Sequence, residues 1–287
     1  MKRLSIVIPV LNQHDLAMAI VEQLIKATDF LTVDTDILII DNGSNEKLAT
    51  NHPKVRVVRN EKSTGVYATF EQGFRETTGD VVLFMHSDLA IWEDGWNRRM
   101  MDDFDADKRL GMVGFIGSNE IDNAGGRGLG TVSNFMGKTL TSSHRFSALE
   151  NFKIWTGSPA EVHGKRTTTL VPAAVVDGCA MAIRRSTWAD IGYRTDYIFH
   201  HFYDKIISCQ VLEHGWKIGV LGIECDHFSG QTVNQEPAYR DAAILWGKTH
   251  GLGNMKFDNA DEVVYKDSET KFLREFRDEK HLIPLHV

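Results

Sequence analysis

The chain has 287 residues, of which 42% are hydrophobic and 25% are charged, proportions that are ordinary for a globular protein. Its formal net charge of −7 argues against a broad surface for nucleic acid. The three cysteines, Cys179, Cys209 and Cys225, are odd in number and form no close pair, which argues against a disulfide framework and a structural zinc site.

Apolar runs alternate with amphipathic stretches over the first 116 residues. The apolar residues within 4–12 predict a buried strand. We expect this strand to end at Pro9, because proline has no N–H to donate to a neighbouring strand. Residues 14–27 follow with the apolar spacing of an amphipathic helix. Further strands are predicted at 36–40, 54–58, 81–85 and 111–116, and further helices at 63–77, capped by Ser63 or Thr64, and at 92–107. Such alternation is typical of a mostly parallel sheet with right-handed crossovers.

The pattern changes after residue 116. Residues 117–170 show no sustained period and contain the run Gly125–Gly128, so we expect a long loop that is either functional or disordered. Order returns with a strand at 173–185 that is interrupted at Asp177–Gly178, a helix at 199–214, a strand at 216–223 and a helix near 237–250.

The strand at residues 81–85 stops on three polar residues, His86, Ser87 and Asp88. In an open α/β sheet, ligands bind at the carboxyl ends of the strands. Side chains repeat every two residues along a strand, so His86 and Asp88 can point the same way. Imidazole and carboxylate groups both bind divalent cations, and a cation here would hold a diphosphate. A strand that ends in an ordinary polar turn is the alternative.

The order of these motifs resembles the inverting nucleotide-sugar transferases of glycosyltransferase family 2, which have the GT-A fold. The resemblance runs from Leu4 to about Ser229. Residues 5–12 match the family's opening strand, and residues 41–45 match the acidic strand end that contacts the nucleotide base. The residues expected to bind the nucleotide are Pro9, Asn12, Asp41, Ser44 and Gly65, the last at a helix start whose amides would suit an anion. A turn residue without ligand contact is the alternative for Asp41.

The resemblance also implies a metal site. Residues 86–88 fall where the family has an Asp-any-Asp metal motif, with His86 in place of the first Asp. Asp226 and His227 resemble the segment whose late histidine closes that site. We therefore expect a divalent cation, Mn²⁺ or Mg²⁺, bound by Asp88, His227 and His86. The alternative for His86 is a buried histidine that forms its hydrogen bonds within the protein and binds no metal. The alternative for His227 is a surface histidine.

Residues 202–204 resemble the family's acidic motif that supplies the catalytic base, with Tyr203 in place of the common Glu. An incoming hydroxyl needs a carboxylate to take its proton, and Asp204 is the candidate general base. Direct displacement would invert the anomeric centre. Because helical spacing turns Phe202 and Ile206 toward the core, we expect Asp204 to be free to reach a cleft. A solvated place on the helix surface is the alternative.

Four residues are assigned to the donor and acceptor side. Asp177 and Gly178 lie in a segment that resembles the acceptor lining of the family. His163 and Arg166 lie in the aperiodic stretch and could bind an anionic acceptor or the diphosphate. A mobile, solvated loop is the alternative for that pair, and a flexible hinge is the alternative to a phosphate cradle for Gly125–Gly128.

The expected organisation is one GT-A domain over residues 1–230 with a helical C-terminal extension over 231–287. Within the domain, 1–116 would bind the nucleotide sugar, 117–172 would form a lid loop beside the acceptor, and 173–230 would form the acceptor half. The expected activity is metal-dependent transfer from a nucleoside-diphosphate sugar, taken to be a UDP-sugar, to a hydroxyl of a glycan or another glycoconjugate.

Two other functions are compatible with the residues. A nucleotidyltransferase would also use an α/β sheet and a metal, and a non-catalytic protein that binds nucleotide sugars would accommodate the departures at His86 and Tyr203. No apolar run reaches the length of a membrane span, and the chain enters its first strand without a signal-peptide pattern, so we expect a cytoplasmic protein.

Overall fold

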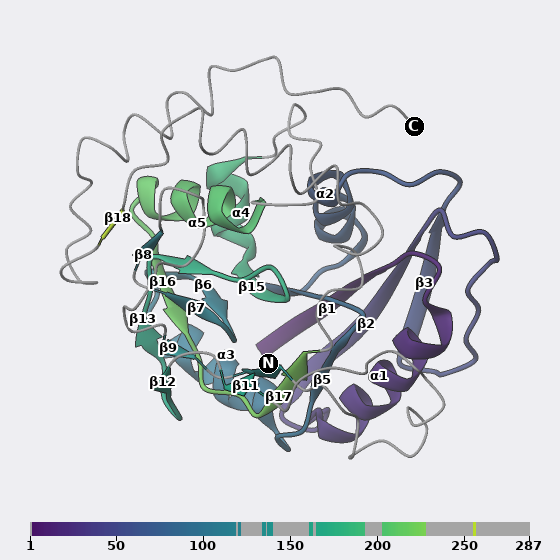
Figure 1. Ribbon diagram of the computed structural model, residues 1–287, viewed down its shortest axis with the longest axis horizontal. Coiled ribbons are helices and arrows are strands. Elements are labelled where there is room, and N and C mark those ends of the chain that lie inside the picture. The colour runs from purple at the N-terminus through teal and green to yellow at the C-terminus, as the bar shows by residue number, and fades with distance from the viewer. Residues whose placement is uncertain are drawn as a thin grey trace.

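The fold is organised around one large mixed sheet, which Figure 1 shows in the computed structural model of the chain. The structure describes residues 2–118, 120–121, 134–135, 137–139, 161–162, 165–192, 203–227 and 255–256. The strands of this sheet are β1 (Lys2–Val10), β2 (Val33–Asn42), β3 (Val55–Asn60), β4 (Val81–Met85), β6 (Leu110–Gly114), β13 (Val171–Pro172), β15 (Ala180–Arg184) and β16 (Lys217–Val220). Their order across the sheet is β13-β16-β6-β15-β4-β1-β2-β3.

Most neighbouring strands of this sheet are parallel. The exceptions are β15 at its centre and β13 at its edge, which runs antiparallel to β16. β1 pairs in parallel with β2 and β4, and β16 pairs in parallel with β6. β15 runs antiparallel to both β4 and β6, with Ala180 opposite Met85. The segment that precedes β15 therefore lies at the carboxyl end of β4, which brings Asp177 and Gly178 to the edge where ligands bind in α/β sheets.

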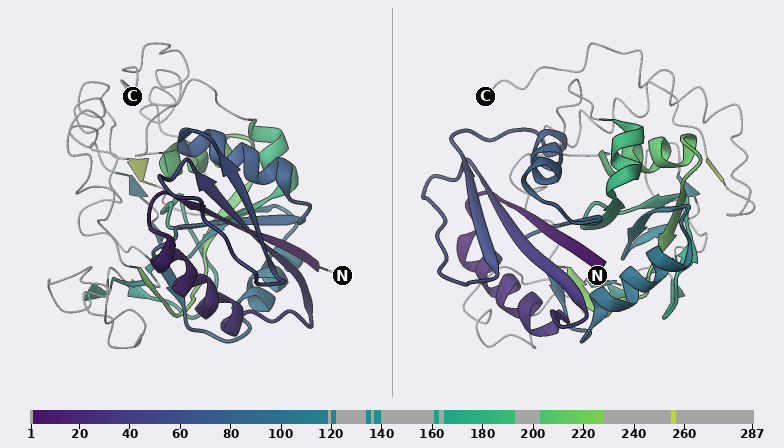
Figure 2. Two further views of the ribbon diagram at one scale, coloured as in Figure 1. Left: turned by 90° about the vertical axis from the view of Figure 1, so that its right-hand side faces the viewer. Right: turned by 180° about the vertical axis from the view of Figure 1, so that it is seen from behind.

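Helices cover both faces of the sheet, as Figure 2 shows. One face is covered by α1 (His14–Ala27) and α3 (Trp96–Ala106), and the other by α2 (Val66–Glu76), α4 (Arg185–Ile191) and α5 (Tyr203–Glu213). Successive strand side chains alternate between these layers: Ile6 packs on the α1 side and Val7 on the α2 side. Burial on both faces explains the continuous apolar runs of β1 and β4, and each large buried side chain stabilises the fold by about 1.5–3 kcal/mol.

A second, smaller sheet lies beside the carboxyl end of β4. It consists of β5 (Leu89–Ile91), β17 (Cys225–His227), β10 (Gly137–Thr139) and β11 (Glu161–Val162), in the order β11-β10-β17-β5. β17 runs antiparallel to β5, with His227 opposite Leu89. Three two-stranded pairs complete the described strands: β14 (Val175–Val176) with β7 (Gly117–Ser118), β12 (Lys165–Arg166) with β9 (Asn134–Phe135), and β18 (Met255–Lys256) with β8 (Glu120–Ile121).

The predicted elements agree with most of the observed ones. α1 and β4 begin and end at the predicted residues, and the predicted break at Asp177–Gly178 separates β14 from β15. Three predictions are wrong. β1 continues through Pro9 to Val10, the helix expected from residue 92 begins at Trp96 because β5 comes first, and α2 is capped by the extended backbone of Gly65 and not by a Ser63 or Thr64 side chain.

Several predictions lie outside the described residues, namely the run Gly125–Gly128, most of the expected lid loop and the helix at 237–250. The division into a domain at 1–230 and a helical extension therefore stays a prediction. None of the described helices combines the length and the apolar content that a bilayer crossing demands.

Candidate active site

Three predicted metal ligands meet at the carboxyl end of β4. His86 and Asp88 directly follow this strand, and His227 comes from β17 of the smaller sheet. One ligand atom from each of the three side chains lies within 4.8 Å of the others. Oδ1 of Asp88 is 3.3 Å from Nε2 of His227 and 3.7 Å from Nδ1 of His86. The pairing of His227 with Leu89 produces this arrangement, since Leu89 is the neighbour of Asp88 in the chain.

The electrostatics of this cluster suit a cation. Burial lowers the pKa of His86, although the Asp88 carboxylate opposes that effect. Burial alone would raise the pKa of Asp88, but His227 and His86 outweigh it, so the pKa of Asp88 lies below its ordinary value. The site therefore combines one buried carboxylate anion with two imidazoles.

A divalent cation fits these donors. Oδ1 of Asp88 is buried and accepts no hydrogen bond of normal geometry from the described residues, even though Nε2 of His227 is 3.3 Å away. Asp88 also forms no ion pair with a lysine or arginine of the described part of the chain. A buried carboxylate without a full positive charge is costly, and a bound cation would supply that charge. His86, Asp88 and His227 are therefore the residues that would hold the metal.

Tyr203 also belongs to the site, through a contact with His86 that the sequence did not predict. Its hydroxyl lies 2.9 Å from Nε2 of His86, and the residue is 5% exposed. Burial raises the pKa of Tyr203, and the nearby Asp204 carboxylate acts in the same direction, so the phenol stays protonated at neutral pH. No local pattern in the sequence signals a contact between residues 117 positions apart.

Asp204, the predicted base, lies at the start of α5 and is only 5% exposed. Its Oδ2 accepts a hydrogen bond from the Gly178 N–H at 3.1 Å and forms an ion pair with Nζ of Lys205 at 2.7 Å. The expectation of a carboxylate free to reach a cleft is therefore wrong for this structure, and so is the solvated alternative. α5 buries nearly its whole circumference, which leaves no solvated side for Asp204.

Asp177 lies on the same edge of the sheet and is half-buried. Its Oδ1 accepts a hydrogen bond from the Cys179 N–H at 2.9 Å, and its own N–H donates to the oxygen of Ile116. Its charge is close enough to act on the pKa of His86. The structure thus brings the predicted acceptor segment, Asp177 and Gly178, against both the predicted base and the metal cluster.

The predicted nucleotide side lies where β1 and β2 end. The Asn12 N–H donates to Oγ of Ser44 at 2.9 Å, and Oδ1 of Asn12 accepts from the Asn45 N–H at 2.7 Å. Asn12 has a positive φ of 59°, a conformation that asparagine tolerates better than most residues. Pro9 lies beside Ile40 of β2. These contacts join the two strand ends that the resemblance assigns to the nucleotide.

Asp41 does not face an open site. It is 0% exposed, and its carboxylate accepts hydrogen bonds from the N–H groups of Ser44 and Leu48 and forms an ion pair with Arg59. These contacts outweigh the cost of burial and lower the pKa of Asp41 to about 2. The Asp41 carboxylate is therefore not available in this structure for the expected contact with a nucleotide base, in which it would accept a hydrogen bond. The alternative, a turn residue, describes the observed contacts.

The remaining site predictions are located only in part. Gly65 is the half-buried cap of α2. Arg166 belongs to β12, but its side chain lies outside the described residues, as does the whole of His163. Lys205 and Arg59, the partners of Asp204 and Asp41, were not predicted. Arg59 lies 18 positions from Asp41, so no local pattern signals that pair, whereas Lys205 directly follows Asp204 and could have been considered from the sequence.

Comparison with known sequences gives two findings. The model of the family described as "Glycosyl transferase family 2" matches residues 5–187. Proteins named undecaprenyl-phosphate 4-deoxy-4-formamido-L-arabinose transferase, from Yersinia enterocolitica and Yersinia pestis, are each 27% identical over 96 residues. These matches cover 31% of this chain and 29% of the relatives' length.

Two solved structures are similar in fold. GalNAc-T7 with UDP, GalNAc and Mn²⁺ has a TM-score of 0.54 and 16% identity, covering 78% of this chain and 43% of that chain. The mannosyltransferase PcManGT from Pyrobaculum calidifontis, in complex with GDP-Man and Mn²⁺, has a TM-score of 0.55 and 14% identity, covering 86% and 62%. These likenesses confirm the predicted fold class, a GT-A-like α/β fold with a mixed, mostly parallel sheet.

Proposed function

The chain belongs to glycosyl transferase family 2, and on this premise we propose that it catalyses the metal-dependent, inverting transfer of a sugar from a nucleotide sugar to a hydroxyl acceptor. The observation that carries the metal step is the convergence of His86, Asp88 and His227 at the carboxyl end of β4. Family membership favours transfer over the two alternatives, nucleotidyl transfer and binding without turnover.

A bound cation would neutralise the charge that develops on the diphosphate leaving group. We propose Mn²⁺ rather than Mg²⁺, because Mg²⁺ prefers oxygen ligands whereas two of the three donors here are imidazoles. Both structural neighbours were determined with Mn²⁺, which supports this choice.

For the donor we propose a UDP-sugar. The neighbour GalNAc-T7 was determined with UDP, which supports the proposal, while PcManGT was determined with GDP-Man and defines the competing possibility. Because the Asp41 carboxylate is engaged by Arg59 and two amides, base selection would fall to other groups at the ends of β1 and β2. Asn12 and Ser44 are the candidates among the predicted residues.

Asp204 is the proposed general base. Its carboxylate lies within hydrogen-bond distance of the Gly178 backbone and is therefore fixed beside the acceptor segment. The ion pair with Lys205 occupies Oδ2 of Asp204, so the acceptor hydroxyl would have to replace a present contact. Asp177, the other carboxylate on this edge, is the competing candidate.

The first experiment is a thermal-shift screen of UDP, GDP, dTDP and CMP with and without Mn²⁺. A ligand that binds only the native state raises the apparent stability by mass action. Stabilisation by UDP that requires Mn²⁺ would support the proposed donor and metal. Stabilisation by GDP alone would overturn the donor, and stabilisation indifferent to Mn²⁺ would overturn the metal step.

Turnover assays then separate the functions. Slow Mn²⁺-dependent hydrolysis of a UDP-sugar is expected of the transferase, release of pyrophosphate would indicate a nucleotidyltransferase, and binding without turnover would indicate a binding protein. The acceptor is proposed to be a hydroxyl of a glycan or glycoconjugate. Since the Yersinia relatives are named for undecaprenyl phosphate, the acceptor screen includes a polyprenyl phosphate, and transfer to that phosphate alone would overturn the hydroxyl acceptor.

A further inference from the structure

The two ring nitrogens of His86 face different partners. Nε2 lies 2.9 Å from the hydroxyl of Tyr203, whereas Nδ1 lies 3.7 Å from Oδ1 of Asp88. We propose that Tyr203 is a positioning residue, whose hydroxyl accepts a hydrogen bond from Nε2–H of His86 and so leaves the Nδ1 lone pair directed at the cation site. This inference rests on the metal step of the proposed function.

The chemistry of imidazole connects the two contacts. A neutral imidazole carries one N–H, and only the other nitrogen has a lone pair that can bind a metal. If Nδ1 of His86 is the ligand, Nε2 must carry the hydrogen and needs an acceptor. Histidines that bind metals generally donate their second N–H to such an acceptor, which selects the tautomer and the orientation of the ring. The Tyr203 hydroxyl is in the place where this acceptor is required.

Packing holds the Tyr203 hydroxyl in that place without any help from a cation. The residue is 5% exposed, and its ring packs edge-on against Phe70 with centroids 5.5 Å apart. A Cβ atom built on Gly178 would lie 2.0 Å from the hydroxyl oxygen. Gly178, which the sequence assigned to the acceptor side, is therefore also needed to make room for the tyrosine. The acceptor of the hydrogen bond is preorganised by the core.

Both bonded residues are departures from the motifs that the chain resembles at the metal and at the base: a histidine replaces the first Asp of the metal motif, and a tyrosine replaces the Glu before the base. A carboxylate at position 86 would bind a cation with no tautomer to select. A histidine there creates a requirement for an acceptor, and Tyr203 meets it. The two departures are therefore connected by one function.

The first test needs no variant. In the full-length protein with ¹⁵N-labelled histidine and bound Zn²⁺, a diamagnetic cation, long-range ¹H–¹⁵N correlations report which ring nitrogen of His86 carries the hydrogen. We expect the Nε2–H form, because the cation then takes the Nδ1 lone pair and the Tyr203 oxygen accepts the hydrogen bond from Nε2. A His86 that carries its hydrogen on Nδ1 would overturn the inference.

The second test compares two matched variants by titration calorimetry with Mn²⁺ alone. Y203F removes only the hydroxyl and should weaken Mn²⁺ binding about 10-fold or more, as loss of a metal ligand's hydrogen-bond partner typically does. Y67F is the control, because Tyr67 is also a buried tyrosine whose hydroxyl bonds a side chain, Gln210, and it should leave Mn²⁺ affinity unchanged. A Y203F protein that binds Mn²⁺ as tightly as the unmutated one would overturn the inference.

A third measurement separates positioning from a general structural effect. In the H86A background there is no ring to orient, so adding Y203F should cause no further loss of Mn²⁺ affinity. The same 10-fold loss in that background would mean that Tyr203 acts through the fold and would overturn the inference. If Y203F leaves Mn²⁺ affinity unchanged, only this inference is overturned. If the unmutated protein binds no Mn²⁺, the metal step of the proposed function is overturned as well.

Discussion

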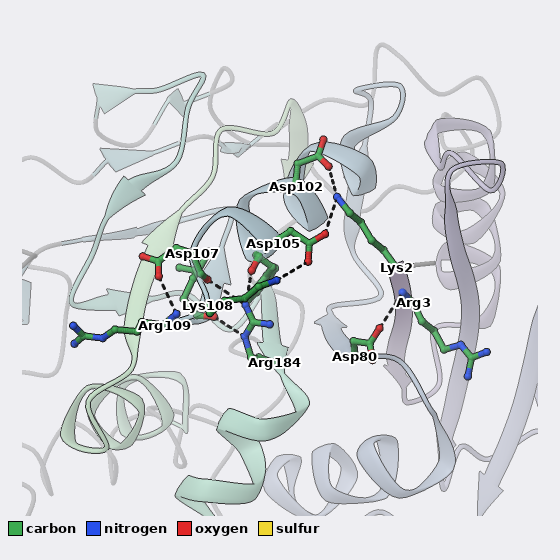
Figure 3. Close-up of polar contacts among 11 residues, drawn as sticks. Lys2, Arg3, Asp80, Asp102, Asp105, Asp107, Lys108, Arg109 and Arg184 are labelled. Carbon is green, nitrogen blue, oxygen red and sulfur yellow. Dashed lines mark hydrogen bonds and ion pairs between the residues drawn. The ribbon is translucent and has the colours of Figure 1, made fainter.

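The two ends of the central sheet both carry many charged groups, but they neutralise them differently. At the amino ends of the parallel strands, Lys2 contacts Asp102 and Asp105 (Figure 3). At the same end, opposite Val81, the Arg184 guanidinium donates to the backbone oxygen of Phe104. Lys2 thus has opposite charges as its partners, and Arg184 has a carbonyl group. The pairs are also open to water: the Lys2 side chain is 28% exposed and that of Asp102 is 61% exposed.

At the carboxyl ends, the Asp88 carboxylate is 13% exposed and faces two imidazoles, one of which has its pKa lowered by burial. No lysine or arginine of the described part of the chain pairs with Asp88. The difference teaches that a concentration of charge does not identify a site. A site is identified by a buried charge that has no full opposite charge beside it. Burying such a charge costs desolvation free energy, which a bound ligand of opposite charge can offset.

The largest expected effect comes from removing that buried charge. Asp88→Ala should abolish the Mn²⁺ dependence of nucleoside diphosphate binding and lower transfer by on the order of a hundredfold or more, since electrostatic stabilisation of the leaving group is worth several kcal/mol. His86→Ala should have a smaller effect, because water can take a vacant position on the cation. Calorimetry with and without Mn²⁺ measures the first effect. Equal diphosphate affinity with and without metal in the unmutated protein would contradict the prediction.

The next effect concerns the proposed base. Asp204→Asn keeps the shape of the side chain and should keep donor affinity, yet it should lower kcat by roughly a hundredfold, because an amide cannot take the acceptor's proton. Single-turnover kinetics measure the chemical step, and donor titration measures affinity. Asp177→Asn is the matched comparison on the same edge. Near-normal transfer by the Asp204 variant, together with a large loss in the Asp177 variant, would move the assignment to Asp177.

Asp41 lies at the same end of the sheet as the metal cluster, but it has an opposite charge, Arg59, as its partner, like Lys2 at the other end. On folding its pKa falls from 3.8 to about 2, because the contacts with Ser44, Leu48 and Arg59 outweigh the opposing effect of burial. A lowered pKa contributes stability above pH 4 that is lost as the pH falls through 3.8 toward about 2, here about 2 kcal/mol.

Asp41→Asn should therefore lower the free energy of unfolding by about 2 kcal/mol at neutral pH, and the difference from the unmutated protein should shrink as the pH falls toward 2. Urea denaturation over this pH range measures it. Asp34→Asn is the control, because the pair of Asp34 with Arg3 is about half exposed and should matter far less. A difference for Asp41→Asn that does not change with pH would show that the carboxylate charge is not its cause.

The smallest effect is expected at the amino ends of the strands. Asp105→Ala removes the exposed contacts with Lys2 and Lys108 and should change the free energy of unfolding by less than about 1 kcal/mol, with no change in Mn²⁺ affinity. Chemical denaturation and calorimetry measure both quantities. A loss of Mn²⁺ binding in this variant would contradict the claim that only the carboxyl ends of the strands take part in metal binding.

Much of the fold was predictable because its signals are local. The apolar spacing of α1 and the continuous apolar run of β4 reflect which faces of each element are buried, and both were located to the residue. The position of His86 and Asp88 after an apolar strand was likewise predictable. The predicted reason for their shared direction was not confirmed, because β4 ends at Met85 and the two residues lie in the turn that follows it. His227 was assigned only because its segment resembles a family motif.

The sequence by itself thus determined the α/β alternation, the strand end that carries the site and the identity of the residues gathered there. Only the tertiary structure decided their partners: β17 pairs with β5 and brings His227 to Asp88, Tyr203 bonds His86, and the Gly178 N–H donates to Asp204. It also directed the Asp41 carboxylate to Arg59 and away from a ligand. The physical reason is range. Periodicity is set by neighbours in the chain, whereas strand pairing and the burial of charges depend on residues far apart in sequence, whose proximity no local pattern encodes.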